Sequence, residues 1–272
     1  MPHGPGSRRC SRRADQQEYP CAHPARCIAH RTVCIGLPIV LHGGLNRGAA
    51  ERERSRRMRI GILGAGGMAA ALGGAWTVAG HDVVIGGRNQ GRAEQTARRI
   101  GAAGHGSLVN AAGHGDVILV AVPAAEAPQL VGSLAGSLAG RTVIDCTNSL
   151  VPTSDGPMLN TGGTTPVARQ LAGAAPDAHV VKAFNLCHVS IWTLRPPTFE
   201  GVPLAVPYCA DHAEAAAATE TLISSIGCTP APCGGLERAA YLEATAALAI
   251  GLWWAGQQPR TAFPLPAEAP PR

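Results

Sequence analysis

Aromatic residues make up only 4% of the 272-residue chain and charged residues only 15%, whereas hydrophobic residues make up 46%. So little charge beside so many hydrophobic residues excludes a largely disordered chain. The shortage of aromatic rings excludes a core of bulky rings, and the 34 glycines favour helices packed closely onto a sheet. Lys182 is the only lysine among 23 basic residues, so an arginine by itself carries little functional weight here.

Excess positive charge is missing from most of the chain. Residues 1–57 hold 11 arginines against 4 acidic residues, whereas residues 58–272 hold 12 basic residues against 14 acidic ones. The larger part is therefore nearly neutral and has no signature of nucleic-acid binding. The nine cysteines form no repeating frame, which favours a reducing, cytoplasmic setting. Cys228 and Cys233 have no second pair nearby, so no metal site is expected.

The first 57 residues differ from the rest of the chain. They are rich in arginine, proline, cysteine and histidine and show no sustained periodicity. Their apolar run at 33–41 is short, is broken by Pro38 and lacks a cleavage site of small residues, which argues against a leader peptide. We expect a disordered extension, and Met58 is an alternative first residue. A leader peptide and an arm that binds metal or nucleic acid are the less favoured hypotheses.

From Met58 onward, short apolar runs alternate with helix-like segments. The predicted strands are 59–63, 81–85, 116–122, 142–146, 180–184 and 204–206. The predicted helices are 67–79, 92–100, 124–138, 212–225 and 236–255. Because parallel neighbours need crossover connections, this alternation predicts an α/β fold, a Rossmann-type doubly wound parallel sheet with a small C-terminal helical element.

The segment 64–69 reads G-A-G-G-M-A and fits the dinucleotide-binding pattern G-x-G-x-x-A. In this pattern the first glycine permits a tight turn, and the second lets the backbone approach a pyrophosphate. Ala69 keeps the following helix close to the sheet, and the free N–H groups at the start of that helix bind the phosphates. A glycine-rich turn without a ligand is the alternative, which the complete strand–helix–strand frame disfavours.

The residues after the second predicted strand indicate NADP(H) rather than NAD(H). NAD-binding folds place an acid there to hold the ribose 2′-hydroxyl, but residues 86–89 read G-G-R-N. Arg88 can bind a 2′-phosphate bidentately, and Arg92, one helical turn further on, adds a second positive charge. The alternative for Arg92 is a solvated helix residue in an arginine-rich chain.

With these residues located, the chain from Met58 to about residue 265 resembles the NADPH-dependent oxidoreductases of the coenzyme F420 (deazaflavin):NADP reductase type. The matching segments are R-I-G-I-L-G-A-G at 59–66, G-G-R at 86–88, V-A-V-P at 120–123, D-C-T-N at 145–148, V-K-A-F-N at 181–185 and L-E-R-A at 236–239. The first three occur in many Rossmann reductases. The segments 181–185 and 236–239 are more specific to this family.

The resemblance implies a set of cofactor contacts. Around the pyrophosphate they are Gly64, Ala65, Gly66, Gly67 and Met68. Around the 2′-phosphate they are Gly87, Arg88 and Arg92, where Gly87 replaces a serine of the family and loses a hydroxyl donor, while Arg92 replaces a lysine and keeps the charge. Around the nicotinamide they are Val122, Pro123, Asn148 and Ala183.

The resemblance also implies direct hydride transfer between NADPH and a bound deazaflavin such as coenzyme F420. Such a step needs two stacked rings in a dry cleft and no side-chain acid or base, so no catalytic residue is assigned. An imine or keto reductase of the hydroxyacid-dehydrogenase type would need a proton donor, for which Lys182, His188 and Tyr208 are the candidates. For Lys182 a structural salt bridge is an equally supported alternative. That class also carries a large helical domain, for which 202–256 is short. A non-catalytic NADPH-binding sensor is a third hypothesis.

The chain divides by these patterns into four parts. We expect an extension at 1–57, an NADP-binding Rossmann domain at 58–200, a small substrate-side or dimerisation part at 201–258 and an irregular tail at 259–272. The last predicted helix is apolar on most faces but shorter than a membrane span. We therefore expect no membrane contact and a homodimer through this helix near Trp253.

Overall fold

The computed structural model describes residues 57–154, 156–160 and 165–262. The predictions for the extension at 1–57 therefore lie outside the described residues, except at Arg57, and so do those for the tail beyond 262. All described residues belong to one structural unit, residues 44–272. The boundary predicted at residue 200 falls between two short paired strands, β9 (Thr198–Phe199) and β10 (Val202–Pro203), and stays a prediction.

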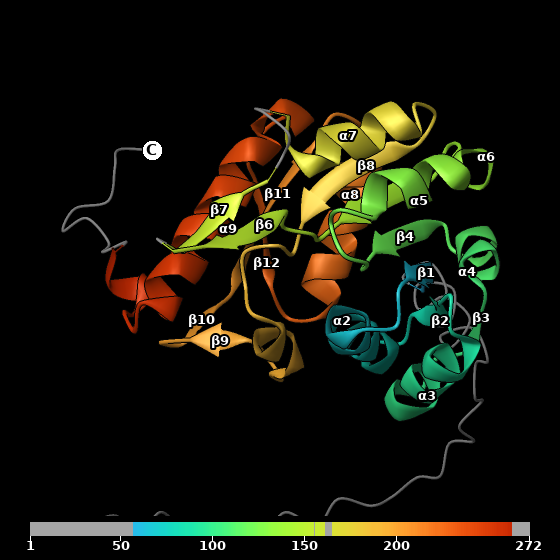
Figure 1. Ribbon diagram of the computed structural model, residues 1–272. Helices are drawn as coiled ribbons and strands as arrows, with labels where there is room; N and C mark the ends of the chain where they lie inside the picture. The colour runs from blue at the N-terminus through green and yellow to red at the C-terminus, as the bar shows by residue number, and fades with distance from the viewer. Residues whose placement is uncertain (1–56, 155, 161–164, 263–272) are drawn as a thin grey trace, which may run out of the picture. The chain divides into compact units, whose positions relative to one another are not determined.

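An eight-stranded sheet forms the centre of this unit (Figure 1). Its strands, in spatial order, are β12 (Thr229–Pro232), β11 (Ala205–Ala210), β8 (His179–Ala183), β5 (Thr142–Asp145), β4 (Val117–Val120), β1 (Arg59–Leu63), β2 (Asp82–Gly86) and β3 (Gly104–Gly106). From β8 to β3 all neighbours are parallel. The Rossmann-type fold predicted from the alternation is confirmed.

One edge departs from the parallel arrangement: β11 runs antiparallel to β8, and β12 is parallel to β11. A parallel neighbour would need a crossover helix packed on the sheet. Residues 184–204 instead hold only a 3₁₀ turn, η1 (Val189–Thr193), and the β9–β10 pair, so the chain reverses direction before β11. The pattern also missed β12, a T-P-A-P segment, because two prolines are tolerated only in an edge strand such as this one.

Helices cover both faces of the sheet. They are α2 (Gly67–Val78), α3 (Gln90–Ile100), α4 (Leu108–His114), α5 (Ala127–Ser133), α6 (Ala135–Leu138), α7 (Val167–Ala174), α8 (Ala213–Ser225) and α9 (Ala239–Trp254). The single helix predicted over 124–138 is two helices, α5 and α6, with a break at Leu134. The helix predicted from 236 starts with a 3₁₀ turn, η2 (Leu236–Arg238), and the tail predicted as irregular begins with another, η3 (Pro259–Ala262).

Side chains alternate between two buried clusters, one on each face of the sheet. In β4, Val117 and Leu119 join the cluster under α2, α3 and α8, whereas Ile118 and Val120 join the cluster under α4, α5 and α7. This double coverage explains why β4 is a continuous apolar run. Among the described residues no helix is long and apolar enough to cross a membrane.

A third small element pairs β6 (Leu150–Thr153) with β7 (Gly156–Leu159), and β7 packs along α9. Figure 1 shows this strand pair beside α9, at the end of the sheet that holds β11 and β12. The strands β4, β1 and β2 lie side by side toward the other edge of the sheet, which β3 forms, and their carboxyl ends point the same way. The candidate site is built there.

Candidate functional site

The turn from β1 into α2 has the geometry that its glycines predict. Gly64 has a φ of +125°, and its N–H donates to the carbonyl oxygen of Gly86 at 2.9 Å. A Cβ on Gly64 would lie 2.3 Å from the carbonyl oxygen of Ala121, so both the conformation and the close approach require glycine. Gly66 precedes α2, and no side chain caps this helix, so the N–H groups of its first turn have no side-chain partner there.

At Gly66 neither the backbone conformation nor the packing of the protein requires a glycine. Its φ of −89° and ψ of −165° are open to any residue, and a Cβ there would meet nothing within 4 Å. The space above Gly66 is therefore open up to the uncapped start of α2. A backbone without a side chain beside free N–H groups is the arrangement that lets a phosphate approach closely.

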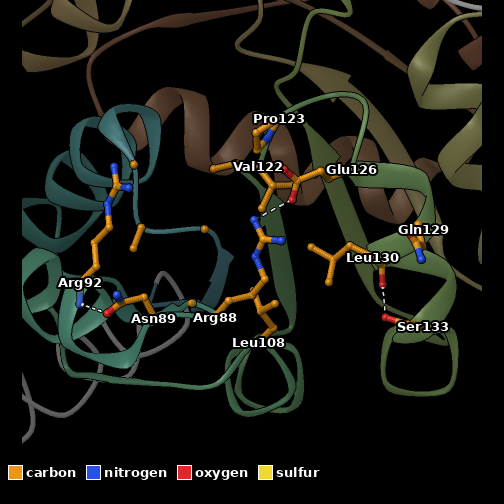
Figure 2. Close-up of a pocket in the computed structure, with 15 residues that line it drawn as sticks. Arg88, Asn89, Arg92, Leu108, Val122, Pro123, Glu126, Gln129, Leu130 and Ser133 are labelled. Carbon is orange, nitrogen blue, oxygen red and sulfur yellow. Dashed lines mark hydrogen bonds and ion pairs between the residues drawn. The ribbon is translucent and has the colours of Figure 1, made fainter.

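A cavity of about 690 Å³ opens over this turn (Figure 2). Its walls come from the ends of β1, β2 and β4, from the starts of α3 and α4 and from the length of α5. The lining residues are Gly64, Ala65, Gly66, Gly87, Arg88, Asn89, Arg92, Leu108, Ala121, Val122, Pro123, Glu126, Gln129, Leu130 and Ser133. Eight of the residues predicted as cofactor contacts are thus brought together around one cavity.

The turn after β2 positions the two arginines of the cavity. Asn89 caps α3, because its side-chain oxygen accepts the backbone N–H of Arg92 at 3.0 Å. This cap fixes where α3 starts and so places Arg92 in its first turn. In Figure 2 Arg88 crosses the cavity toward Glu126, whereas Arg92 rises along the opposite side. The Arg88 Nη2–Glu126 Oε2 distance is 2.8 Å.

Four predicted contacts do not line this cavity. Gly67 and Met68 lie in the first turn of α2, and Met68 packs against the core. Ala183 is fully buried at the end of β8. The Asn148 amide is paired with Asn185: Asn148 Nδ2 donates to the Asn185 carbonyl at 2.8 Å, and Asn185 Nδ2 donates to Asn148 Oδ1 at 2.9 Å. The contacts predicted for these four residues remain predictions.

The chain turns sharply after β8. Phe184 has a φ of +62°, which is a strained conformation for an aromatic residue. Its ring packs edge-on between Trp76, at 5.6 Å, and Trp192, at 5.4 Å. Because this packing holds the turn, η1 lies against α2, and Val189 is the nearest side chain to Gly67. The loop after β8 therefore packs against α2 near its start.

The single lysine belongs to a buried ionic cluster. Lys182 is fully buried, and its Nζ lies 2.9 Å from Asp145 Oδ2, 2.8 Å from Glu243 Oε1 and 2.6 Å from the carbonyl oxygen of Thr147. Burial lowers the pKa of Lys182, but the two carboxylates outweigh it and the net shift is upward. Glu243 also accepts the backbone N–H of Val167 at the start of α7. Lys182 thus ties β5, β8 and α9 together.

The other two candidate proton donors lie apart from each other. Tyr208 is buried in β11 and donates its O–H to Glu220 of α8. Burial and this hydrogen bond raise the pKa of Tyr208 to about 12. His188 is exposed at the start of η1, where its Nδ1 lies 2.9 Å from Ser190 Oγ and its ring lies 5.6 Å from that of Trp253. None of the three candidates lines the cavity.

The mostly parallel sheet is that of a Rossmann-type fold, and the glycine turn with the cavity above it has the form of a dinucleotide-binding site. Residues 59–149 match the family described as NADP oxidoreductase, coenzyme F420-dependent. The resemblance predicted from the sequence is therefore confirmed, and the matched family and a similar solved structure agree with the prediction of an NADP-dependent oxidoreductase. A search among curated proteins gives no match.

Two solved structures share about a quarter of the sequence. A protein of Arthrobacter sp. FB24 to which F420-dependent NADP reductase activity is attributed is 26% identical, with a TM-score of 0.66 over 74% of this chain and 96% of its own. A hypothetical protein of Sinorhizobium meliloti is 25% identical, with a TM-score of 0.58 over 68% and 89%. A reductive aminase of Aspergillus terreus, at 17% identity, a TM-score of 0.54 and coverage of 74% and 63%, shares the fold.

Sequence reasoning missed part of the cavity wall. Ala121, Asn89 and Leu108 line it, as do the residues of the α5 side, Glu126, Gln129, Leu130 and Ser133. Asn89 and Ala121 stand beside predicted contacts and were within reach of the motif. The α5 residues were not, because nothing local in the sequence shows which helix faces Arg88.

Proposed function

We propose that the cavity binds NADP(H), with the pyrophosphate at the uncapped start of α2 and the adenosine 2′-phosphate at Arg88. The observation that carries this proposal is the open space over Gly66. The protein itself has room for a side chain at residue 66, yet the position is a glycine beside free N–H groups and two arginines. This arrangement fits a phosphate ligand that occupies the space a side chain would fill. Arg92 lines the same cavity and supplies a second positive charge.

We further propose that the reaction is hydride transfer between NADP(H) and a deazaflavin of the F420 kind. When bound, the dihydronicotinamide supplies the hydride, and the acceptor ring takes it up with a proton from solvent. The residues of the chain hold and orient the two rings and keep water out. Val122 and Pro123 line the cavity wall and are proposed on the nicotinamide side. Asn148 stays a proposed contact there, held in place by Asn185.

The test compares binding and turnover in Gly66→Ala and the wild type. NADPH binding is measured by the change in its fluorescence, and turnover by the loss of NADPH absorbance on adding oxidised F420. The new Cβ meets nothing in the protein, so Gly66→Ala should keep the wild-type melting temperature while NADPH affinity falls at least tenfold. Unchanged NADPH affinity in Gly66→Ala would contradict the proposal that the phosphates bind beside Gly66.

The alternatives give different results in the same assay. Oxidation of NADPH by imines or ketones, but not by F420 or flavins, would favour the imine or keto reductase. Lys182 and Tyr208 are engaged in buried contacts, which leaves the exposed His188 as its proton donor. Tight NADPH binding with no oxidation by any acceptor would favour the sensor. A cytoplasmic setting is also proposed, on the five free cysteines among the described residues.

A further inference from the structure

Glu126 is the only acidic residue in the described wall of the cavity, and it faces the arginine proposed to recognise NADP(H). It stands at the start of α5, where its backbone N–H donates to the carbonyl oxygen of Pro123 at 2.9 Å. This turn follows β4, so Glu126 and Arg88 approach from opposite walls. Figure 2 shows the two side chains meeting across the cavity.

The contact uses the atoms that a phosphate would need. Glu126 Oε2 lies 2.8 Å from Arg88 Nη2, and a bidentate phosphate contact would take up one or both Nη groups of the same guanidinium. The side chains of Arg88 and Glu126 are 77% and 45% exposed, so their pairing is a weak surface contact that a bound ligand can displace. Arg92 has no carboxylate within ion-pair distance among the described residues.

We propose that Glu126 is a specificity-determining residue that opposes the 2′-phosphate and so narrows the preference for NADP(H) over NAD(H). This inference rests on the proposed function. Glu126 pairs with Arg88 when the cavity is empty, so an incoming phosphate must displace it. When the ligand is bound, the negative charge of Glu126 repels the phosphate. NAD(H) has no 2′-phosphate, so it leaves the Arg88–Glu126 pair intact.

The test compares two adenosine ligands that lack the nicotinamide and differ in whether they carry the 2′-phosphate. Adenosine 2′,5′-bisphosphate carries the 2′-phosphate, whereas adenosine 5′-monophosphate lacks it, and calorimetric titration measures both. In Glu126→Gln the affinity for the bisphosphate should rise about 2–5-fold, the range expected for one exposed ion pair. The affinity for the monophosphate should stay within about 1.5-fold, by the same argument. NADPH and NADH should follow the same pattern.

Salt provides a readout that a merely structural effect would not move. Charge repulsion between Glu126 and the phosphate is screened by salt, so the advantage of Glu126→Gln should shrink toward onefold at about 1 M salt. Glu94→Gln is the matched control, because Glu94 forms an exposed ion pair with Arg98 on α3 and does not line the cavity. Glu94→Gln should leave both affinities unchanged.

Unchanged or weaker bisphosphate binding in Glu126→Gln, with normal binding by the wild type, would overturn this inference alone. An equal gain for bisphosphate and monophosphate would also overturn it, because the effect would not involve the 2′-phosphate. If neither protein binds NADPH or the bisphosphate, the proposed function fails and this inference fails with it.

Discussion

The backbone of Gly64 passes so close to Ala121 that a Cβ on Gly64 would lie 2.3 Å from the Ala121 carbonyl oxygen. Gly64→Ala should therefore damage the fold itself. Overpacking against backbone and the unfavourable positive φ together predict a loss of about 2–4 kcal/mol in the free energy of unfolding, measured by urea denaturation. A loss below about 0.5 kcal/mol would mean that the turn moves easily.

Gly66→Ala is the matched control for that experiment. It makes the same chemical change two residues away, at a position with open space and an ordinary φ. Its free energy of unfolding should stay within about 0.5 kcal/mol of the wild type. The two glycines of one motif are thus separated, since Gly64 is required by the protein and Gly66 by the proposed ligand.

Arg88→Glu should weaken the binding of NADPH far more than the binding of NADH. It removes the proposed partner of the 2′-phosphate and places a second carboxylate opposite Glu126. Because the contact removed is charge-assisted and bidentate, the affinity for NADPH should fall roughly 10–100-fold, measured by fluorescence titration. The control is Arg99→Glu, an exposed position in the last turn of α3. Equal losses for both cofactors would mean that Arg88 does not contact the 2′-phosphate.

Lys182→Met should destabilise the protein strongly because it leaves Asp145 and Glu243 buried without their cation. Breaking such a pair costs about 3–5 kcal/mol in the free energy of unfolding. Glu243→Gln should cost less, about 1–3 kcal/mol, because Lys182 keeps Asp145 and the Thr147 carbonyl. Urea denaturation measures both variants. If Lys182→Met is as stable as Glu243→Gln, the cluster does not depend on its cation.

The buried Tyr208 predicts a loss of stability at high pH. Its pKa is raised to about 12 by burial and by Glu220, against about 10 in an unfolded chain. Between these values the folded protein holds the proton that the unfolded chain releases, so this contribution is complete below pH 10 and is lost as the pH rises to about 12. Tyr208→Phe should flatten the fall in unfolding free energy over that range. An identical slope in the variant would contradict the shift.

The sequence predicted the parts of the site that are local in the chain. The turn at 64–69 and the arginine at 88 each depend on a strand and its next few residues, and both fall where the motif places them. Glu126 was not foreseen, because its role depends on α5 standing opposite the end of β2. A structural salt bridge is one of the roles that the sequence allows for Lys182, but its partners Asp145 and Glu243 were not foreseen for the same reason, since distant segments supply them.

The fold differs from the prediction where a local sequence pattern is too weak to mark a strand or does not show in which direction the strand runs. A short apolar run predicts a strand at 204–206 but not whether it runs parallel or antiparallel to β8. Proline-rich β12 and the three-residue β3 lack the apolar alternation that marks a strand. Both are edge strands, where only one neighbour supplies hydrogen bonds and the sequence is least constrained.

The outer face of α9 predicts association with a second copy of the chain. Tyr241, Leu248, Trp253 and Trp254 are each more than half exposed, and the one charged residue of α9, Glu243, is buried in the Lys182 cluster. The Arg238 guanidinium lies 5.3 Å from the Tyr241 ring, but Leu248, Trp253 and Trp254 belong to a part of α9 with no charged residue, and such an apolar surface can meet its own copy about a twofold axis without repulsion between like charges. We therefore expect a homodimer in light scattering coupled to size exclusion. Leu248→Glu should yield the monomer mass, whereas Val109→Glu, at an equally exposed apolar residue of α4, should leave the dimer intact. A monomeric wild type would show that α9 is not the contact between subunits.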